Sequence, residues 1–196
     1  MHSNSKETYS ELPRELLAAA EDGDLRAVKK GLIENPKSVN LSEPEFGWTM
    51  LHRAARFGHD RLVALLLRAG SNPNLCDKGQ STPLHDAATG HEHTLASMVL
   101  LVEAGAKLEV LNAWLQSPLH VCAFYSNWPG FIYLLGKGAN PWLKDSENEN
   151  ALEAAKTQLA SVNPERRYAR QRKELRMMIN ILSCLDSDAS SLPHRP

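Results

Sequence analysis

The sequence predicts an all-α solenoid, in which similar helix pairs stack in a row. The first observation is a repeat: Thr49, Thr82, Ser117 and Asn150 begin four similar units, which are therefore 33, 35 and 33 residues apart. The second is that the first three units each contain two apolar stretches with helical spacing, and the third is that a glycine follows the second stretch. A chain of 196 residues, 42% of them hydrophobic, is long enough to bury the core of such a stack.

The first helix of each unit is expected to begin directly after the threonine or serine. These residues are favoured N-caps, because their hydroxyl groups accept hydrogen bonds from amides of the first turn. Pro83 and Pro118 follow at a position where no backbone N–H is needed. One leucine per unit is expected to point into the stack, and one small residue per unit lets the helices approach closely. These are Leu51, Leu84, Leu119 and Leu152, and Ala54, Ala87, Cys122 and Ala155.

The second helix of each unit comprises an apolar run, LVALLL, MVLLV or FIYLL, and is expected to end at Gly70, Gly105 or Gly138. Glycine tolerates the left-handed backbone conformation that commonly follows a helix end. A polar link comes next, in which an Asx residue is expected to open the turn into the following unit. These Asx residues are Asp77, Asn112 and Asp145.

Two units depart from the common pattern. The second unit has 21 residues from Leu84 to Gly105, whereas the first has 19 from Leu51 to Gly70, so the segment TGHEHT is expected to form an enlarged turn. In the third unit Ser126-Asn127 replaces Gly-His, and Asn127 is expected to cap the second helix.

With the motif TPLHDA at 82–87 and a period near 33 residues, the chain resembles the ankyrin-repeat family. The resemblance implies an ankyrin-repeat solenoid at 12–160, followed by a C-terminal capping helix. Its expected parts are an N-terminal cap at 12–46, repeats at 47–80, 81–116 and 117–149, a degenerate repeat at 150–160, an amphipathic helix at 163–185, and disordered ends at 1–11 and 186–196. In the cap, apolar residues predict two helices: Leu16, Ala19 and Ala20, then Leu25, Val28, Leu32 and Ile33.

The resemblance also accounts for most of the histidines. His52, His85 and His120 stand at the family's signature histidine, which implies a structural role near the turn, and His91 belongs to the Gly-His of the repeat. Only His93 in this region has no such explanation. HEHTL lacks the second histidine of the H-E-x-x-H zinc motif. We therefore expect no metal site and no cofactor.

Composition narrows the possible partners and the compartment. The 22 basic and 23 acidic residues give a net charge of -1, so we expect neither nucleic acid nor a membrane as a partner. Cys76, Cys122 and Cys184 match neither a disulfide framework nor a CxxC pattern. With no signal-peptide pattern at the start, the sequence predicts a protein of the cytoplasm, the nucleus or both, monomeric when alone.

No enzyme motif is present, so we expect a non-enzymatic protein. Ankyrin stacks are typically protein-binding modules, which implies an adaptor, scaffold or inhibitor that binds a protein or peptide in its concave groove. The positions that line this groove in the family hold many aromatic residues, and aromatic and arginine side chains dominate binding at interfaces. The predicted protein-binding residues are Trp48, Arg56, Phe57, Lys78, Trp114, Gln116, Phe124 and Tyr125. Core packing stays open as an alternative for Trp48, Phe57 and Phe124.

The C-terminal helix is a second candidate site. Its apolar residues have helical spacing, and its first half is basic. The apolar residues are Leu175, Met178, Ile179, Leu182 and Leu185, and the basic patch is Arg166, Arg167, Arg170, Arg172, Lys173 and Arg176. We favour the interpretation that the apolar stripe caps the stack. The alternatives are a helix that binds a calmodulin-like partner and a basic surface for nucleic acid or acidic membrane.

Overall fold

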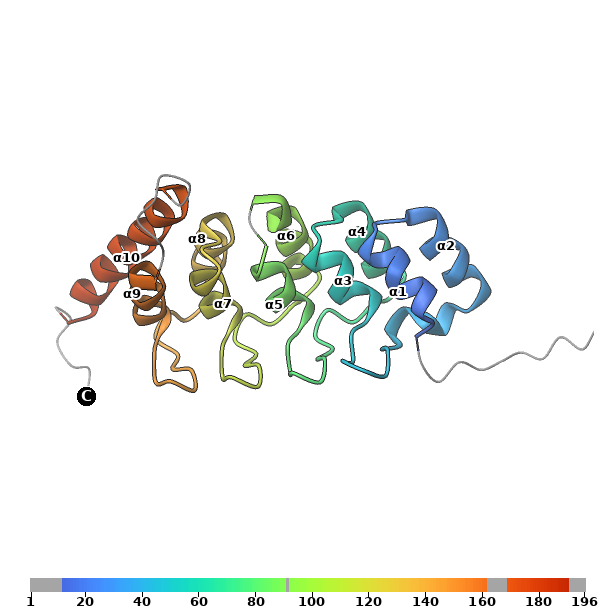
Figure 1. Cartoon of the computed structure of the whole chain (residues 1–196), viewed down its shortest axis with the longest axis horizontal. Helices are drawn as coiled ribbons and strands as arrows, with labels where there is room; N and C mark the ends of the chain where they lie inside the picture. The colour runs from blue at the N-terminus through green and yellow to red at the C-terminus, as the bar shows by residue number, and fades with distance from the viewer. Residues whose placement is uncertain (1–11, 91, 162–168, 191–196) are drawn as a thin grey trace, which may run out of the picture.

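A computed structural model describes residues 12–90, 92–161 and 169–190, and these residues form a row of helix pairs (Figure 1). The order is α1 (Arg14–Glu21), α2 (Leu25–Glu34), the 3₁₀ helix η1 (Pro36–Asn40), α3 (Met50–Arg56), α4 (Asp60–Arg68), α5 (Pro83–Ala88), the 3₁₀ helix η2 (Glu92–Thr94), α6 (Leu95–Glu103), α7 (Pro118–Phe124), α8 (Trp128–Gly136), α9 (Ala151–Ser161) and α10 (Ala169–Ser190). The described residues contain no sheet, only an isolated bridge between Ser42 and Thr49. The predicted all-α class is confirmed.

The helices lie in two layers. The inner helices α1, α3, α5, α7 and α9 pack on one another in series, and the outer helices α4, α6 and α8 follow the same order behind them. The hairpin loops that join successive units all project from one side of the row (Figure 1). The inner helices and the hairpins together form one face, which we name the concave face after the resemblance stated above. Helix α10 closes the C-terminal end by packing on α9 and α8.

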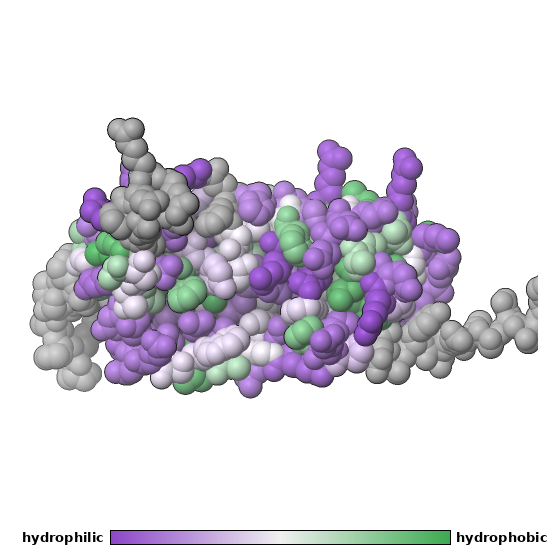
Figure 2. Space-filling model, in the orientation of Figure 1, coloured by the Kyte–Doolittle hydropathy of each residue, from purple (hydrophilic) through white to green (hydrophobic). Residues whose placement is uncertain are grey.

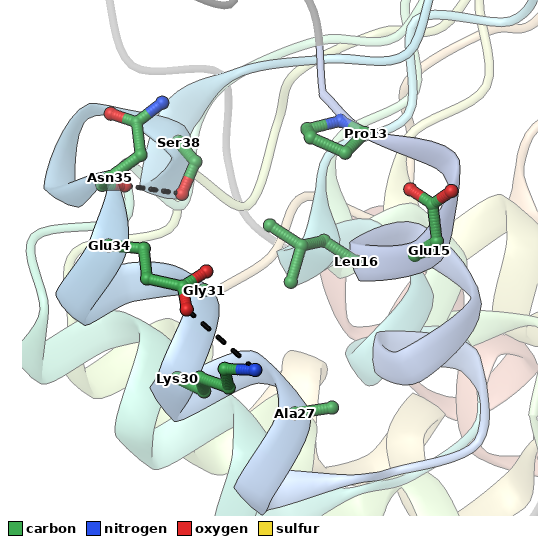
Figure 3. Close-up of a pocket in the computed structure, with 9 residues that line it drawn as sticks. All are labelled: Pro13, Glu15, Leu16, Ala27, Lys30, Gly31, Glu34, Asn35 and Ser38. Atoms are coloured by element: carbon green, nitrogen blue, oxygen red, sulfur yellow. Dashed lines mark hydrogen bonds and ion pairs between the residues drawn. The ribbon is translucent and has the colours of Figure 1, made fainter. Parts of the chain in front are cut away.

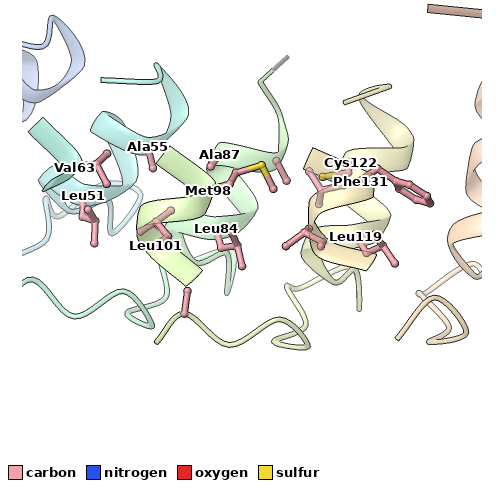
Figure 4. Packing of buried hydrophobic residues seen from close by; sticks show 14 of the residues in the cluster. Leu51, Ala55, Val63, Leu84, Ala87, Met98, Leu101, Leu119, Cys122 and Phe131 are labelled. Carbon is pink, nitrogen blue, oxygen red and sulfur yellow. The ribbon is translucent and has the colours of Figure 1, made fainter. Parts of the chain in front are cut away.

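The core repeats from unit to unit as the sequence predicts. Leu51, Leu84 and Leu119 are at most 1% exposed and occupy equivalent places in successive units (Figure 4). The small residues Ala54, Ala87, Cys122 and Ala155 are fully buried between helices. Truncating one of the buried leucines to alanine typically costs about 2 to 5 kcal/mol, so each unit depends strongly on its own leucine.

The predicted helix ends and turns are also confirmed. Gly70, Gly105 and Gly138 have φ of +94°, +89° and +89° after the second helix of their units. The enlarged turn of the second unit contains η2, which contacts α6 and α8. Asn127 caps α8, because its Oδ1 accepts a hydrogen bond from Gly130 N at 3.0 Å, and its Nδ2 donates to Ala88 O at 3.2 Å. This cap therefore also joins the third unit to the second.

Three details differ from the sequence prediction. Ile33 is 72% exposed, because Gly31 holds the inward position opposite Leu16 and a helical residue two places later points the other way. Helix α10 extends to Ser190, past the predicted end at 185, and no glycine or proline interrupts it. Leu185 is exposed rather than packed against the stack, whereas Leu182, one turn earlier, is fully buried.

Candidate functional site

The hairpins of the concave face are held by one side chain each. Asp77 Oδ1 accepts from Ser81 N at 2.8 Å, and Asn112 Oδ1 accepts from Trp114 N at 3.0 Å and Gln116 N at 2.9 Å. Asp145 makes the same pair of contacts in the last hairpin. These three residues were expected to open the turns. The hairpin tips are therefore rigid platforms for the side chains that they expose.

The first hairpin uses a residue that the sequence pattern missed. Glu43 is 7% exposed, and its carboxylate accepts hydrogen bonds from Glu45 N at 2.7 Å and Phe46 N at 2.5 Å. Glu43 lies farther along the chain from its helix cap Thr49 than Asp77, Asn112 and Asp145 lie from their caps. The longer glutamate side chain spans this extra distance. A search for any carboxylate just before each cap, rather than for Asp or Asn at one spacing, would have found it.

Successive hairpin tips are bonded to one another through their backbones. Lys78 N donates to Phe46 O at 2.8 Å, Ala113 N donates to Gly79 O at 2.8 Å, and Ser146 N donates to Trp114 O at 2.9 Å. The predicted site residue Lys78 also donates from Nζ to Pro44 O at 2.5 Å. The tips thus form one continuous edge of the concave face.

The signature histidines join each helix cap to the next hairpin. His85 Nδ1 accepts from Thr82 N at 3.1 Å, so Nε2 carries the proton and donates to Gln116 O at 3.0 Å. His52 and His120 repeat this arrangement with Thr49 and Ser117 as caps. Burial lowers the pKa of the His85 imidazole to about 4 and also lowers the pKa of His120. Both are neutral at pH 7, as a structural role requires.

The fourth unit replaces the histidine with a carboxylate. Glu153 Oε2 accepts from Asn150 N at 2.8 Å, while Asn150 Oδ1 accepts from Leu152 N and Glu153 N at 3.0 Å. Lys144 Nζ pairs with the same Glu153 oxygen at 2.5 Å. Among the residues that the structure describes, no group of three or more His, Cys, Asp and Glu side chains is placed to hold a metal ion. His91 lies outside the described residues.

At its N-terminal end the concave face carries a closed aromatic stack. The rings of Phe46 and Trp48 lie 4.3 Å apart with 20° between their planes, and the Arg53 guanidinium lies 3.5 Å above the Trp48 ring. Arg53 Nε is also 3.6 Å from Glu21 Oε2, an ion pair too long to be a hydrogen bond. We name Phe46, Trp48 and Arg53 the closed stack. It ties the first hairpin to the N-terminal cap.

Arg56, the last residue of α3, and Phe57, which follows it, lie next along the face. Arg56 Nη1 pairs with Asp86 Oδ1 at 3.2 Å, so this predicted site residue bridges two units. Asp86 is 6% exposed, and burial raises the pKa of its carboxyl group although Arg56 opposes the shift. Phe57 is exposed, and its ring lies 6.3 Å from the imidazole of His59.

The third unit exposes the remaining predicted aromatics. Trp114, at the tip of its hairpin, is 58% exposed, and among the described residues no aromatic ring stacks on it. Phe124 and Tyr125, at the end of α7, are both exposed and meet edge to face at 5.3 Å. We name Trp114, Phe124 and Tyr125 the open group. The structure places its members at the two ends of one inner helix rather than in one cluster.

Gln116 contributes to the hairpin mainly through its backbone. Its carbonyl accepts from His85 Nε2, and its amide donates to Asn112. Leu115, beside Trp114, was not predicted as a site residue. It is exposed and has a positive φ of +56°, a conformation that costs a non-glycine residue about 1 kcal/mol or more. Strain of this kind is often retained where the side chain has a use.

On the face shown in Figure 2, hydrophobic side chains form separate patches within a mostly hydrophilic surface. A hollow of about 300 Å³ lies between α1 and α2. There Leu16 points toward Gly31 (Figure 3), where a Cβ would come within 2.4 Å of the leucine. None of the predicted site residues lines this hollow. No helix within the described ranges combines the length and apolar character needed to cross a membrane.

The basic patch is only partly within the described residues, since Arg166 and Arg167 lie outside them. Arg170 Nε pairs with Glu174 Oε1 at 3.0 Å on α10. Lys173 and Arg176 are exposed, and Arg172 is half-buried. Leu175, Met178 and Leu182 of the same helix are fully buried. The helix therefore caps the stack with its apolar face, and its basic residues remain at the surface.

Comparison with known proteins agrees with this architecture. A family model described as ankyrin repeats in three copies matches residues 16–112. Cyclin-dependent kinase inhibitor 2A of Monodelphis domestica is 35% identical over 123 residues, which are 61% of this chain and 67% of the inhibitor. A transient receptor potential cation channel subfamily A member 1 homolog of Caenorhabditis elegans is 32% identical over 137 residues, which are 70% of this chain. The human 2-5A-dependent ribonuclease is 40% identical over 73 residues, which are 37% of this chain.

These matches differ in how much of the relative they cover. The aligned part is 11% of the channel homolog and 10% of the ribonuclease, so in both the similarity concerns a small part of a much longer protein. It extends over two thirds of the kinase inhibitor. The residues that the family model matches, 16–112, include the first two histidine caps and their hairpins. The chain belongs to the ankyrin-repeat family.

Proposed function

We propose that this chain is a non-enzymatic interaction module that binds a partner protein or peptide on its concave face, with the open group as anchor. Ankyrin repeats are generally protein-interaction modules. The observation that carries the proposal is the exposure of Trp114 at a hairpin tip and of Phe124 and Tyr125 at the other end of α7. Large aromatic side chains bury much area and have few rotatable bonds to immobilise, so they make effective anchors.

Charge pairing on the same face supports an apolar mode of binding. Arg53 pairs with Glu21, Arg56 with Asp86, and Lys144 with Glu153, so these charges are compensated within the chain. Side chains that are already paired have little to offer a charged partner, whereas the open group is available for apolar contact. We expect the partner segment to present apolar side chains, and the affinity to depend only weakly on salt.

Binding through the concave face is compatible with two roles in a complex, inhibitor and adaptor. The similar Monodelphis domestica protein is named an inhibitor of cyclin-dependent kinase, and this chain aligns with 67% of it. A module without catalytic groups can act by covering a surface of its partner, as an inhibitor, or by holding two proteins together, as an adaptor. A scaffold subunit held permanently in a complex is the alternative, and aggregation of the isolated chain would favour it.

A quantitative affinity enrichment from cell lysate tests the proposal. The baits are the wild-type chain, the variant Trp114→Ala/Phe124→Ala, and the control Ile33→Ala/Ile132→Ala, which truncates two exposed apolar residues on the outer helices α2 and α8. Circular dichroism confirms that each variant is folded. We expect a partner that the wild type and the control retain and the concave variant loses. A partner that the concave variant retains at the wild-type level contradicts the proposed site.

A further inference from the structure

Helix α10 presents two chemically different faces. Leu175, Met178 and Leu182 are fully buried and pack toward the stack. The opposite face forms a shallow hollow of about 330 Å³. We name it the basic face, and its lining residues are Ala169, Arg172, Lys173, Arg176, Met177 and Asn180. They recur every three or four positions, so they form one stripe along the helix.

Within the described residues, no ion pair neutralises the cations of the basic face. Glu174 is the acidic residue nearest to them in sequence, and it pairs with Arg170 at 3.0 Å. Arg172, Lys173 and Arg176 form no ion pair with any acidic residue that the structure describes. This differs from the concave face, where the arginines are paired. Three uncompensated cations within one and a half turns attract an anionic partner.

We propose that the basic face binds an acidic helical segment of a partner protein, independently of the concave face. Arg172 and Arg176 lie one turn apart, about 6 Å along the axis. Carboxylates at positions i and i+4 of a partner helix have the same spacing and can each accept two hydrogen bonds from a guanidinium. The exposed Met177 and the Asn180 amide continue the stripe, and they provide the apolar and polar contacts that a protein side chain uses.

The same observations argue against two other anionic partners. A membrane-binding helix inserts its apolar stripe into the bilayer, but here that stripe is buried against the stack. Single-stranded nucleic acid is held largely by stacking on aromatic rings, and residues 169–190 contain no aromatic residue. Three cations alone provide only weak, salt-sensitive attraction for either polyanion.

Fluorescence anisotropy with a labelled synthetic peptide tests the proposal. The probe is a helical peptide with glutamates at every i and i+4 position of one face, and a second peptide carries glutamine in their place. The test variant is Arg172→Gln/Lys173→Gln/Arg176→Gln. The control Lys29→Gln/Arg61→Gln/Arg68→Gln removes the same number of charges from exposed positions on α2 and α4. All chains are checked for folding by circular dichroism.

We expect the glutamate peptide to bind the wild type and the control within about twofold of each other, and the test variant about tenfold more weakly. The glutamine peptide should bind none of them. Met177→Ala should weaken peptide binding as well, because a protein segment packs on that side chain whereas a bare polyanion does not.

Three results would overturn the proposal. The first is no binding of the glutamate peptide to the wild type. The second is an equal loss of binding in the control variant, which would show that only net charge matters. The third is that phosphatidylserine vesicles or a single-stranded RNA bind the basic face more tightly than the peptide does, with no effect of Met177→Ala.

Discussion

The concave face carries two aromatic groups that are held differently, although one ring of each is exposed to the same degree. Phe46 of the closed stack is 46% exposed and Phe124 of the open group is 47% exposed. Phe46 lies on Trp48, which in turn lies under Arg53, whereas the ring of Phe124 meets edge to face the ring of Tyr125, which is itself exposed. Exposure alone therefore does not separate a structural aromatic from an available one. The contacts made by its neighbours do.

The hairpin of Phe46 and Trp48 and the hairpin of Trp114 also differ in the residue that adopts a positive φ. Gly47 takes the positive φ of the first hairpin, at +81°, and a Cβ there would lie 2.9 Å from Lys78 N. In the hairpin of Trp114 the corresponding conformation, φ +56°, is adopted by Leu115. The first hairpin is thus built for close packing of its neighbours. The other keeps a large exposed side chain at an energetic cost.

The largest expected effect is a difference in acid stability between the Trp114 hairpin and the first hairpin. His85 holds the Trp114 hairpin through Gln116 O, and its pKa is about 4 when folded, below the ordinary 6.5. The unfolded chain therefore takes up this proton first as the pH falls. Neutral His85 therefore contributes about 3 kcal/mol to the free energy of unfolding. This contribution is fully present above pH 6.5 and is lost as the pH falls to 4.

Urea unfolding measured between pH 7.5 and pH 4.5 checks this expectation. The variant His85→Ala should lose less unfolding free energy over this interval than the wild type. Amide exchange should show the hairpin at 112–117 opening in acid before the hairpin at 43–48, which Glu43 holds. An identical acid loss in His85→Ala and wild type would contradict the assignment.

The next effect distinguishes the two tryptophans by stability. Trp48→Ala removes the partner of both Phe46 and Arg53, whose side chain is only 15% exposed, and should lower the unfolding free energy by about 2 kcal/mol. Trp114→Ala removes an exposed side chain and should change it by less than about 0.5 kcal/mol. Urea titrations followed by circular dichroism measure both. Equal losses would show that Trp114 is structural too.

The smallest effect concerns the backbone of the Trp114 hairpin. Leu115→Gly should raise the unfolding free energy by about 1 kcal/mol, because glycine adopts a positive φ without strain. Asn148→Gly is the matched control at the same place in the last hairpin, where φ is +61° and asparagine already tolerates the conformation. It should change stability by only a few tenths of a kcal/mol. A loss of stability in Leu115→Gly would mean that the Leu115 side chain packs against the rest of the chain and is not available to a partner.

Much of the fold could be predicted because it depends on local rules. The caps at Thr49, Thr82 and Ser117, the glycines that end the second helices, and the capping role of Asn127 all follow from residue types a few positions apart. The solenoid follows from repeating them. The exposure of Ile33 and of Leu185 could not be predicted, because it depends on which face of the helix meets its neighbour in the folded chain.

The candidate site was harder to predict for the same reason. The sequence placed Trp48 and Trp114 in one set, because both lie near a hairpin. Their difference comes from Phe46 and Arg53, which contact only Trp48. Arg56 was predicted only as a protein-binding residue, and its pairing with Asp86, 30 residues away in the next unit, was not predicted. A sequence pattern within one unit does not predict ion pairs between side chains of different units.

The most direct test of the central claim is the dissociation constant of the partner recovered by affinity enrichment, measured for four single variants. If the open group anchors the partner, Trp114→Ala and Phe124→Ala should each weaken binding by about 30-fold, which corresponds to about 2 kcal/mol. Phe46→Ala and Trp48→Ala, measured where both remain folded, should weaken it by no more than about twofold. The reverse pattern, with binding lost in the closed-stack variants and kept without Trp114 and Phe124, would contradict the account.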